Sequence, residues 1–342
     1  MKQAYIPEPG KIIYRDVERP VIKPGMVIIK VSRVGICGSD VHVFKGKHPV
    51  VGPPAVPGHE FSGYVEEVGE GVSGLKKGDL VTIQPAMGCK SCRACREGLF
   101  AQCENLSFVG GIGISGGGSE YFTIQAEYVV KMPENATPDD AAMVEPLSVA
   151  VHSVRKMPNI EGKDVLVTGA GTIGNLIAQV ARVFKAKNVI VSEIMPTRIE
   201  IAKKCGFSVI NPTKVDSFEN ELKKYLSGEC LSIAFECSGN GNALNTCIKV
   251  VSRGGYVIVA GVYESGTVDT EMVLVQDKEL NLLGTLMYTW DDYHSAVDLI
   301  AENKVNLKIL QTHHFNFDRW IDGYNLLTAK SCDAIKVLID MD

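Results

Sequence analysis

The sequence lacks a basic tail, a long apolar run and any repeated or low-complexity tract. No stretch approaches the roughly 20 consecutive apolar residues that a membrane-spanning helix needs, and no apolar signal segment follows Met1. The formal net charge is −5, so polyanionic nucleic acids and anionic membranes would repel the protein. These absences argue against nucleic-acid and membrane partners and lead us to expect a cytoplasmic protein.

The composition is that of an ordinary globular protein. The 342 residues are enough for two domains, and 45% of them are hydrophobic and 22% charged. The 34 glycines predict many tight turns and close approaches of the backbone. Because no secretory segment is evident, the ten cysteines indicate thiols and metal thiolates rather than disulfides.

A mixed set of metal-binding side chains begins at Cys37 and continues at His59 and Glu60. Sulfur, imidazole and carboxylate ligands together favour zinc over calcium or magnesium, which prefer oxygen ligands only. Cys37 and His59 are too far apart for one turn, so separate loops would deliver them, and such sites often keep a position open for substrate. A buried thiol beside a structural histidine is the alternative interpretation of this pattern.

Four further cysteines lie in one compact segment. They are Cys89, Cys92, Cys95 and Cys103. Four thiolates match a closed tetrahedral zinc site, which leaves no position for substrate and is therefore structural. A zinc-ribbon module for nucleic acid would instead use two separated cysteine pairs and a basic surface.

Glu145 directly precedes Pro146, which fits the first turn of a helix. A carboxylate at that place complements the positive end of the helix dipole, so Glu145 can serve as a cap. It can also serve as a third metal ligand. From the sequence, both roles stay open.

A nucleotide-binding motif follows an apolar strand at 164–168. Gly169, Gly171 and Gly174 lie between this strand and a helix with one apolar face, as in a Rossmann fold. The first glycine permits the turn, the second lets the backbone approach a pyrophosphate, and the third allows close helix packing. Thr172 and Ile173 complete the loop at the helix N-terminus, where amide groups bind phosphate.

The next strand ends at Glu193. A carboxylate at this position accepts hydrogen bonds from the adenosine ribose and repels a 2′-phosphate, which favours NAD over NADP. Arg198, five residues later, keeps NADP open as an alternative.

Two kinds of pattern divide the chain. Residues 2–128 show short alternating strands broken by Gly and Pro, which predict a partly closed β-barrel, whereas the middle of the chain alternates strands and helices as a doubly wound parallel sheet does. We predict a catalytic β-barrel domain from residues 1–150 and 285–342 and a nucleotide domain from 151–284. A last strand at 335–339 would rejoin the barrel.

The motifs taken together resemble the zinc-dependent medium-chain dehydrogenase/reductase family, in its sorbitol/polyol dehydrogenase branch. The resemblance extends over nearly the whole chain. The segments that carry it are 37–42, 58–63, the four-cysteine segment, 145–149 and 169–174. It implies an α/β fold with a GroES-like β-barrel catalytic domain and a Rossmann domain, two zinc ions per chain, NAD, and a homodimer or homotetramer.

The resemblance also implies residue roles. The catalytic zinc would be held by Cys37, His59 and either Glu60 or Glu145, two carboxylates that can exchange during turnover. Ser39 would take the proton of the substrate hydroxyl and His42 would pass it to solvent. The expected reaction moves a hydride from a secondary alcohol of a polyol, sugar or sugar phosphate to NAD and yields a ketone.

Two positions depart from the sorbitol-type pattern. Sorbitol-type members carry Tyr and Arg where this chain has Val43 and Met287, which argues against sorbitol itself as the substrate. Met287-Tyr288 and the run at 58–64 resemble instead the galactitol-1-phosphate dehydrogenase type. Lys45, Lys47 and His48 could offer charge to a phosphate, although exposed lysines are commonly only solvated.

Three other interpretations stay open. A threonine-type amino-alcohol dehydrogenase shares the zinc and NAD motifs, and a zinc-free quinone reductase shares the fold. A zinc- and nucleotide-binding scaffold is the non-enzymatic alternative.

Overall fold

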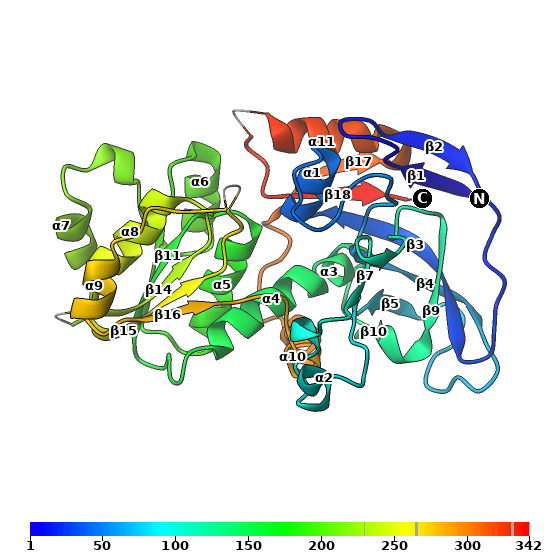
Figure 1. Cartoon of the computed structure of the whole chain (residues 1–342), viewed down its shortest axis with the longest axis horizontal. Helices are drawn as coiled ribbons and strands as arrows, with labels where there is room; N and C mark the ends of the chain where they lie inside the picture. Colours follow the sequence, from blue (N-terminus) through cyan, green and yellow to red (C-terminus); the bar gives the residue numbers. More distant parts are fainter. Residues whose placement is uncertain (229, 264–265, 330–331, 342) are drawn as a thin grey trace. The chain divides into compact units, whose positions relative to one another are not determined.

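The computed structural model describes residues 1–228, 230–263, 266–329 and 332–341. Two compact units divide the chain (Figure 1). The first consists of Met1–Glu145, Ala296–Glu302 and Gln311–Asp342, and the second of Pro146–Ser295 and Asn303–Leu310. The domain limits drawn from the sequence at 150 and 285 stay a prediction.

The first unit is mainly β-structure. Its strands are β1 (Lys2–Tyr5), β2 (Ile13–Asp16), β3 (Met26–Ile36), β4 (Glu60–Val68), β5 (Leu80–Ile83), β6 (Ala86–Met87), β7 (Ser107–Val109), β8 (Gly113–Ile114), β9 (Tyr121–Gln125), β10 (Val129–Lys131), β17 (Gln311–Asn316) and β18 (Lys336–Asp340). Its helices are α1 (Gly38–Phe44), α2 (Arg93–Arg96), α3 (Pro138–Ala142) and α11 (Trp320–Thr328), with 3₁₀ turns η1 (Phe100–Gln102), η2 (Ala126–Tyr128) and η4 (Phe317–Arg319).

A seven-stranded sheet organises this unit around β3. The strand order is β10-β5-β4-β3-β18-β17, and β9 also pairs with β3. β18 runs antiparallel to β3, with Val337 opposite Ile36, which confirms that the last strand rejoins the N-terminal β region. β3 and β18 lie inside this sheet, and most of their residues are buried.

The second unit is a doubly wound α/β fold. Its strands are β11 (Asp164–Thr168), β12 (Asn188–Ser192), β13 (Ser208–Ile210), β14 (Leu231–Glu236), β15 (Val251–Val259) and β16 (Asn281–Gly284). Its helices are α5 (Thr172–Val183), α6 (Pro196–Lys204), α7 (Phe218–Lys223), α8 (Gly241–Val250) and α9 (Met272–Asp277), with the 3₁₀ turn η3 (Pro212–Lys214). Helix α4 (Val144–Arg155) lies largely in this unit, and helix α10 (Trp290–Ala301) begins in it and ends in the first unit.

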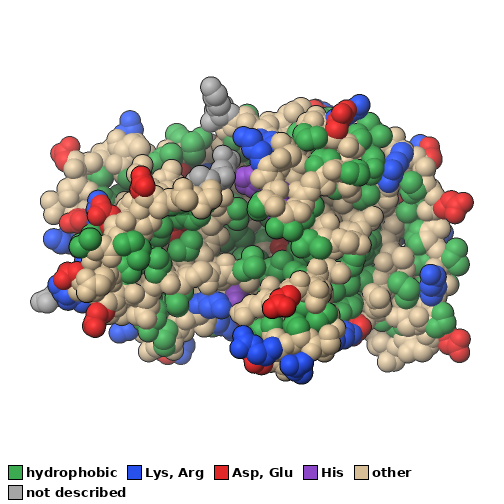
Figure 2. Space-filling view, in the orientation of Figure 1, with side chains coloured by type: hydrophobic (Ala, Val, Ile, Leu, Met, Phe, Trp, Pro, Cys, Tyr) green, Lys and Arg blue, Asp and Glu red, His purple; other side chains and the backbone are tan. Residues whose placement is uncertain are grey.

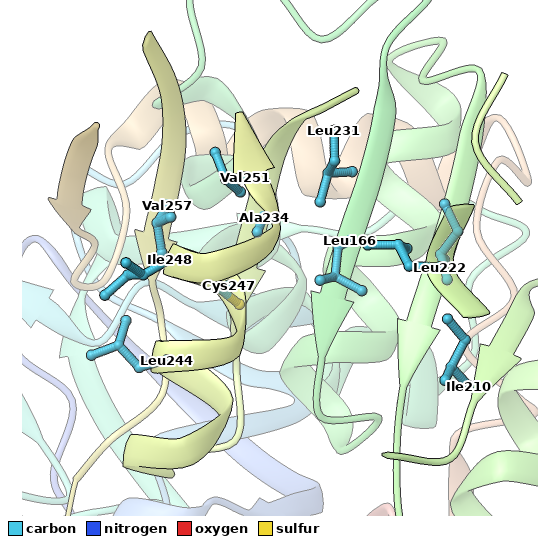
Figure 3. Packing of buried hydrophobic residues seen from close by; sticks show 11 residues of the cluster. Leu166, Ile210, Leu222, Leu231, Ala234, Leu244, Cys247, Ile248, Val251 and Val257 are labelled. Carbon is cyan, nitrogen blue, oxygen red and sulfur yellow. The ribbon is translucent and has the colours of Figure 1, made fainter. Parts of the chain in front are cut away.

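The six strands of this sheet are parallel and follow the order β13-β12-β11-β14-β15-β16. The order reverses between β11 and β14, which is the switch point where such sheets bind dinucleotides. Leu166, Ala234 and Val257 from the strands pack with Leu244 and Ile248 of α8 in the core (Figure 3). The architecture confirms the predicted fold class of Rossmann sheet plus GroES-like β-barrel.

A buried carboxylate joins α4 to the start of α10 within the second unit. Asp292 lies 2.7 Å from Nδ1 of His152 and accepts a 2.8 Å hydrogen bond from Arg155. Thr289 donates hydrogen bonds to the Asp292 carboxylate from both its amide and its hydroxyl, and these bonds cap the start of α10. Burial raises the pKa of Asp292, but the bonds from His152, Thr289 and Arg155 lower it overall.

Charged side chains of both signs lie on the face of the molecule shown in Figure 2. On the face shown in Figure 2, Lys and Arg side chains alternate with Asp and Glu around the rim. Among the described residues, no helix combines the length and apolarity that crossing a membrane requires.

Candidate metal centre and nucleotide site

The structure brings together the three residues of the mixed metal-binding set. Cys37 follows β3 at the N-cap of α1, His59 directly precedes β4, and Glu60 is the first residue of that strand. One ligand atom from each of Cys37, His59 and Glu60 lies within 4.8 Å of the other two. Pairing of β3 with β4 explains this meeting, because it sets Gly35 opposite Glu60 at the strand ends.

Asp40 orients two of these residues. Its carboxylate lies 3.3 Å from Nδ1 of His59 and accepts a 2.9 Å hydrogen bond from the Cys37 amide. Nδ1 is thereby engaged, and Nε2 is left as the ring nitrogen that a metal ion can bind. Burial opposes the charged imidazole, but the Asp40 carboxylate raises the pKa of His59 well above its usual value.

Glu60 forms a buried ion pair with Lys336, a residue that the sequence patterns did not identify. Nζ of Lys336 lies 2.5 Å from Oε2 of Glu60 and donates a 3.3 Å hydrogen bond to the Ile36 carbonyl. Burial lowers the pKa of Lys336, but the nearby Glu60 and Cys37 raise it overall, so the lysine keeps its charge. A Cβ at Gly35 would lie 2.3 Å from the same Glu60 oxygen, so a side chain there would displace Glu60 from its ion pair.

This donor set fits zinc. A thiolate, an imidazole and a carboxylate are three ordinary zinc ligands, and three protein ligands leave a fourth position for substrate. Glu145 is buried at the start of α4 and is not a member of the close group found among the described residues. Its role as a ligand stays a prediction.

A glycine-rich segment supports the loop that carries His59. The amides of Gly117 and Gly118 donate to the carbonyls of Gly58 and Pro57 at 2.7 and 2.9 Å. A Cβ at Gly116 would lie 2.2 Å from the Pro57 oxygen, so a side chain cannot be accommodated without moving the loop. The density of glycine at 110–118 was visible in the sequence, but its partner loop was not.

The predicted proton path lies on α1. Ser39 and His42 are both half-buried and three residues apart, which places them on one side of the helix. The described residues show no hydrogen bond between these two side chains, so the relay stays a prediction. Val43, at the position of the missing tyrosine, is buried.

The basic residues after α1 have different environments. Lys45 and Lys47 are exposed. Nδ1 of His48 accepts hydrogen bonds from the amides of Val50 and Val51 at 3.2 and 3.0 Å, so this imidazole helps to form the turn. Burial and the neighbouring His42 lower the pKa of His48, which makes it a poor partner for an anion.

The four-cysteine segment folds into a lobe of its own. The sulfur atoms of Cys89, Cys92, Cys95 and Cys103 all lie within 4.8 Å of one another. Sγ of Cys92 and Sγ of Cys103 are 3.8 Å apart. Zn–S bonds of about 2.3 Å in a tetrahedron set the sulfurs about 3.8 Å apart, so the lobe has the dimensions of a zinc site.

Backbone amides and a hydroxyl stabilise thiolates in this lobe. The amide of Cys92 and the hydroxyl of Ser91 donate to Sγ of Cys89 at 3.4 and 3.3 Å. The Ser91 hydroxyl is the main cause that lowers the pKa of Cys89 to about 5. Desolvation and the neighbouring thiols raise the pKa of Cys95 to about 12. The donors around Cys89 thus favour its thiolate, which is the form that binds zinc.

The glycine loop of the second unit has the geometry that a dinucleotide needs. Gly169 has φ of +89°, and a Cβ at Gly174 would lie 1.8 Å from the Gly169 carbonyl oxygen. Gly171 is the N-cap of α5 and has no side chain to accept hydrogen bonds from the first turn. The amides of that turn, at Thr172 and Ile173, are the groups that would bind a pyrophosphate.

Glu193 lies at the edge of the loop, after β12. Its Oε2 accepts a 2.7 Å hydrogen bond from the Ala170 amide, and its Oε1 accepts from the amides of Ile194 and Met195 at 2.7 and 2.9 Å. Two carboxylate oxygens offer about four acceptor positions, so at least one stays available to a ribose hydroxyl. The Arg198 guanidinium lies 3.8 Å from the Cβ position of Gly171, which brings it to the same loop.

Comparison with known proteins decides the family. Residues 23–134 match the alcohol dehydrogenase GroES-like domain and residues 172–302 match the zinc-binding dehydrogenase domain. Sorbitol dehydrogenase 1 of Saccharomyces cerevisiae is 34% identical over 96% of this chain and 95% of its own length. The chain belongs to the zinc-dependent medium-chain dehydrogenase/reductase family. It is therefore an oxidoreductase.

Solved structures of this family have the same fold. Galactitol-1-phosphate dehydrogenase from Escherichia coli is 26% identical with a TM-score of 0.91 and full coverage of both chains. An Escherichia coli alcohol dehydrogenase that was determined with NADH is 29% identical, with a TM-score of 0.90 over 100% of this chain and 99% of that one. A Sinorhizobium meliloti dehydrogenase bound to NADP is 27% identical, with a TM-score of 0.90 over 99% of each chain.

Proposed function

We propose that this family member oxidises a secondary alcohol of a polyol, sugar or sugar phosphate to a ketone, with NAD as the hydride acceptor. The observation that carries the proposal is the close group of half-buried Cys37 and buried His59 and Glu60, whose three donors would leave one position free for a hydroxyl. The glycine loop and Glu193 of the second unit supply the features of a dinucleotide site.

A zinc ion held by Cys37, His59 and Glu60 would supply a Lewis acid that makes the substrate hydroxyl more acidic. Asp40 holds the His59 ring in the orientation that this role requires. The ion pair with Lys336 holds the Glu60 side chain in place in the interior. Ser39 would accept the hydroxyl proton, and His42 would carry it toward solvent from the same helix.

NAD is the preferred cofactor on electrostatic grounds. The Glu193 carboxylate would accept a hydrogen bond from the ribose and repel a 2′-phosphate. Arg198 at the same loop could bind that phosphate, and family members of known structure contain either NADH or NADP. A comparison of kcat/KM with NAD and with NADP tests this preference.

A sugar-based substrate agrees with the names of relatives. Similar proteins include sorbitol dehydrogenases, D-xylulose reductases and a galactitol-1-phosphate dehydrogenase. The buried Val43 gives no hydroxyl partner where sorbitol-type members have Tyr, so we expect a substrate other than sorbitol. The exposed Lys45 and Lys47 are compatible with a phosphate on it.

Self-association is part of this proposal. β16 ends the parallel sheet and its Leu282 is exposed. The exposed apolar residues Met272, Val273 and Leu286 lie near it in the sequence. An uncovered strand edge can pair with a second copy of the chain, which would form a homodimer. Light scattering of the wild type and of Leu282→Lys, which should be monomeric, tests this point.

The decisive experiment is a substrate panel read by NADH absorbance. It should contain sugar alcohols, sugar alcohol phosphates, aldose and ketose phosphates, and threonine. Turnover of a polyol or a sugar phosphate supports the proposal. Turnover of threonine alone would replace it by an amino-alcohol dehydrogenase, and activity that survives complete removal of zinc would replace it by a quinone reductase type of chemistry.

A further inference from the structure

Glu236 is a buried carboxylate that lies at the carboxyl end of β14, in the second unit. Its Oε1 accepts hydrogen bonds from the amide and hydroxyl of Ser238 at 2.7 and 2.5 Å and from the Gly239 amide at 3.1 Å. Its Oε2 accepts a 2.8 Å hydrogen bond from the hydroxyl of Tyr263. These donors are neutral, so Glu236 organises the surrounding backbone and does not balance a positive charge.

Two loops meet at this carboxylate. Ser238 and Gly239 follow β14, whereas Tyr263 belongs to the loop that follows β15. The loops touch through their backbones, because a Cβ at Gly239 would lie 2.2 Å from the Val262 carbonyl oxygen. The absence of a side chain at Gly239 lets the two loops touch, and the hydrogen bond from Tyr263 to Glu236 connects them.

The fastened loops flank the nucleotide site. A Cβ at Gly169, in the glycine loop, would lie 3.1 Å from atoms of Ser238. In a doubly wound sheet the dinucleotide crosses the switch point, which here lies between β11 and β14. If Glu193 binds the adenosine ribose on the β12 side, the residues at the carboxyl ends of β14 and β15 are those that would hold the nicotinamide half.

We propose that Glu236 and Tyr263 form a clasp that positions these two loops for the nicotinamide half of the dinucleotide. Both are positioning residues, since neither needs to touch the reacting atoms. The inference rests on the proposed binding of NAD. It predicts that weakening the clasp impairs binding of the whole dinucleotide but leaves binding of its adenosine half intact.

Tyr263→Phe tests the clasp by removing one hydroxyl. The dissociation constant of NADH is measured from the fluorescence of the bound nicotinamide, and that of AMP by calorimetry. Loss of one hydrogen bond should raise the dissociation constant of NADH by roughly three- to tenfold. AMP affinity should not change. Tyr256→Phe is the matched control, because Tyr256 lies in β15 of the same sheet and its side chain has no hydrogen bond among the described residues.

Substitution of Glu236 gives a second, independent comparison. Glu236→Gln keeps an acceptor for Ser238 and an amide that can donate to the Tyr263 oxygen, whereas Glu236→Ala removes every contact. The glutamine variant should therefore bind NADH more tightly than the alanine variant. If Glu236→Ala does not fold, the Tyr263→Phe comparison decides alone.

Three results would overturn the clasp. The first is an unchanged affinity for NADH in Tyr263→Phe. The second is a loss of AMP affinity in that variant as large as its loss of NADH affinity, and the third is a loss of NADH affinity in Tyr256→Phe as large as that in Tyr263→Phe. A wild-type protein that binds AMP but not NADH contradicts the proposed function itself. That outcome is distinct from a wild type that binds NADH and a Tyr263→Phe variant that binds it equally well.

Discussion

Replacement of Lys336 by methionine tests the buried ion pair beside the metal centre. Met has a similar length and shape, so it fills the volume but leaves the Glu60 carboxylate without its cation. Both residues are almost fully buried, at 2% and 1% side-chain exposure. Removing one partner of such a pair costs about 3–5 kcal/mol, because the remaining charge stays in the interior. We expect the free energy of unfolding of the metal-free protein to fall by that amount.

The assay can follow the first unit alone. The sequence has only two tryptophans, and Trp320 is buried in that unit. In a Trp290→Phe background, denaturant unfolding followed by fluorescence therefore reports the stability of the unit that holds Lys336 and Glu60. Addition of zinc should recover part of the loss in Lys336→Met, because the ion supplies positive charge to Glu60.

Two further variants separate charge from packing. Glu60→Gln added to Lys336→Met removes the stranded charge and should restore part of the lost stability of the metal-free protein. Lys30→Met is the matched control, because this lysine lies on β3 of the same sheet and is exposed. The reasoning would be refuted if Lys336→Met lost less than about 1 kcal/mol or no more than Lys30→Met.

Other predictions concern the lobe, the glycine segment and the helix network. Cys92→Ser should lower the zinc content from two ions to one per chain and reduce the thermal midpoint, whereas unchanged zinc would exclude the lobe as a site. Gly116→Ala should displace the loop before His59 and lower zinc affinity at the catalytic site, while Gly52→Ala, whose Cβ meets no atom within 4 Å, should not. The pKa of Asp292 in the folded protein lies below its ordinary value near 3.8. The ionised carboxylate therefore stabilises the fold at pH values above 3.8, and this stabilisation is lost as the pH falls. Asp292→Asn should therefore lose less stability than the wild type between about pH 5 and about pH 3, and equal losses would contradict the assignment.

Local patterns were enough to predict much of this protein. Alternating and apolar runs predicted the two kinds of sheet, and the spacing of glycines predicted the turn between β11 and α5. The cysteine spacing predicted the lobe, because all four thiols come from one short segment. Cys37, His59 and Glu60 were candidates because the residue types themselves indicate zinc, and the structure brings them together. Their binding of zinc stays a prediction.

Contacts between distant segments were not predictable in this way. Lys336 is 276 positions from Glu60, and nothing in its own strand shows which carboxylate it meets. The only available signal was a single lysine within an apolar strand, which predicts a buried charge that needs a partner. Glu236, at the end of the apolar strand β14, likewise predicts a buried charge that needs a partner, but its partner Tyr263 lies in the loop after another strand.

The central claim is that the group of Cys37, His59 and Glu60 binds zinc and that this ion is required for NAD-dependent oxidation of a sugar-based alcohol. The most direct test measures zinc content and NADH formation together in the wild type and in Cys37→Ser, with the best substrate of the panel. We expect two zinc ions and turnover in the wild type, and one ion, an intact fold and no turnover in Cys37→Ser. Full activity in a Cys37→Ser protein that retains only the zinc of the four-cysteine lobe would contradict it.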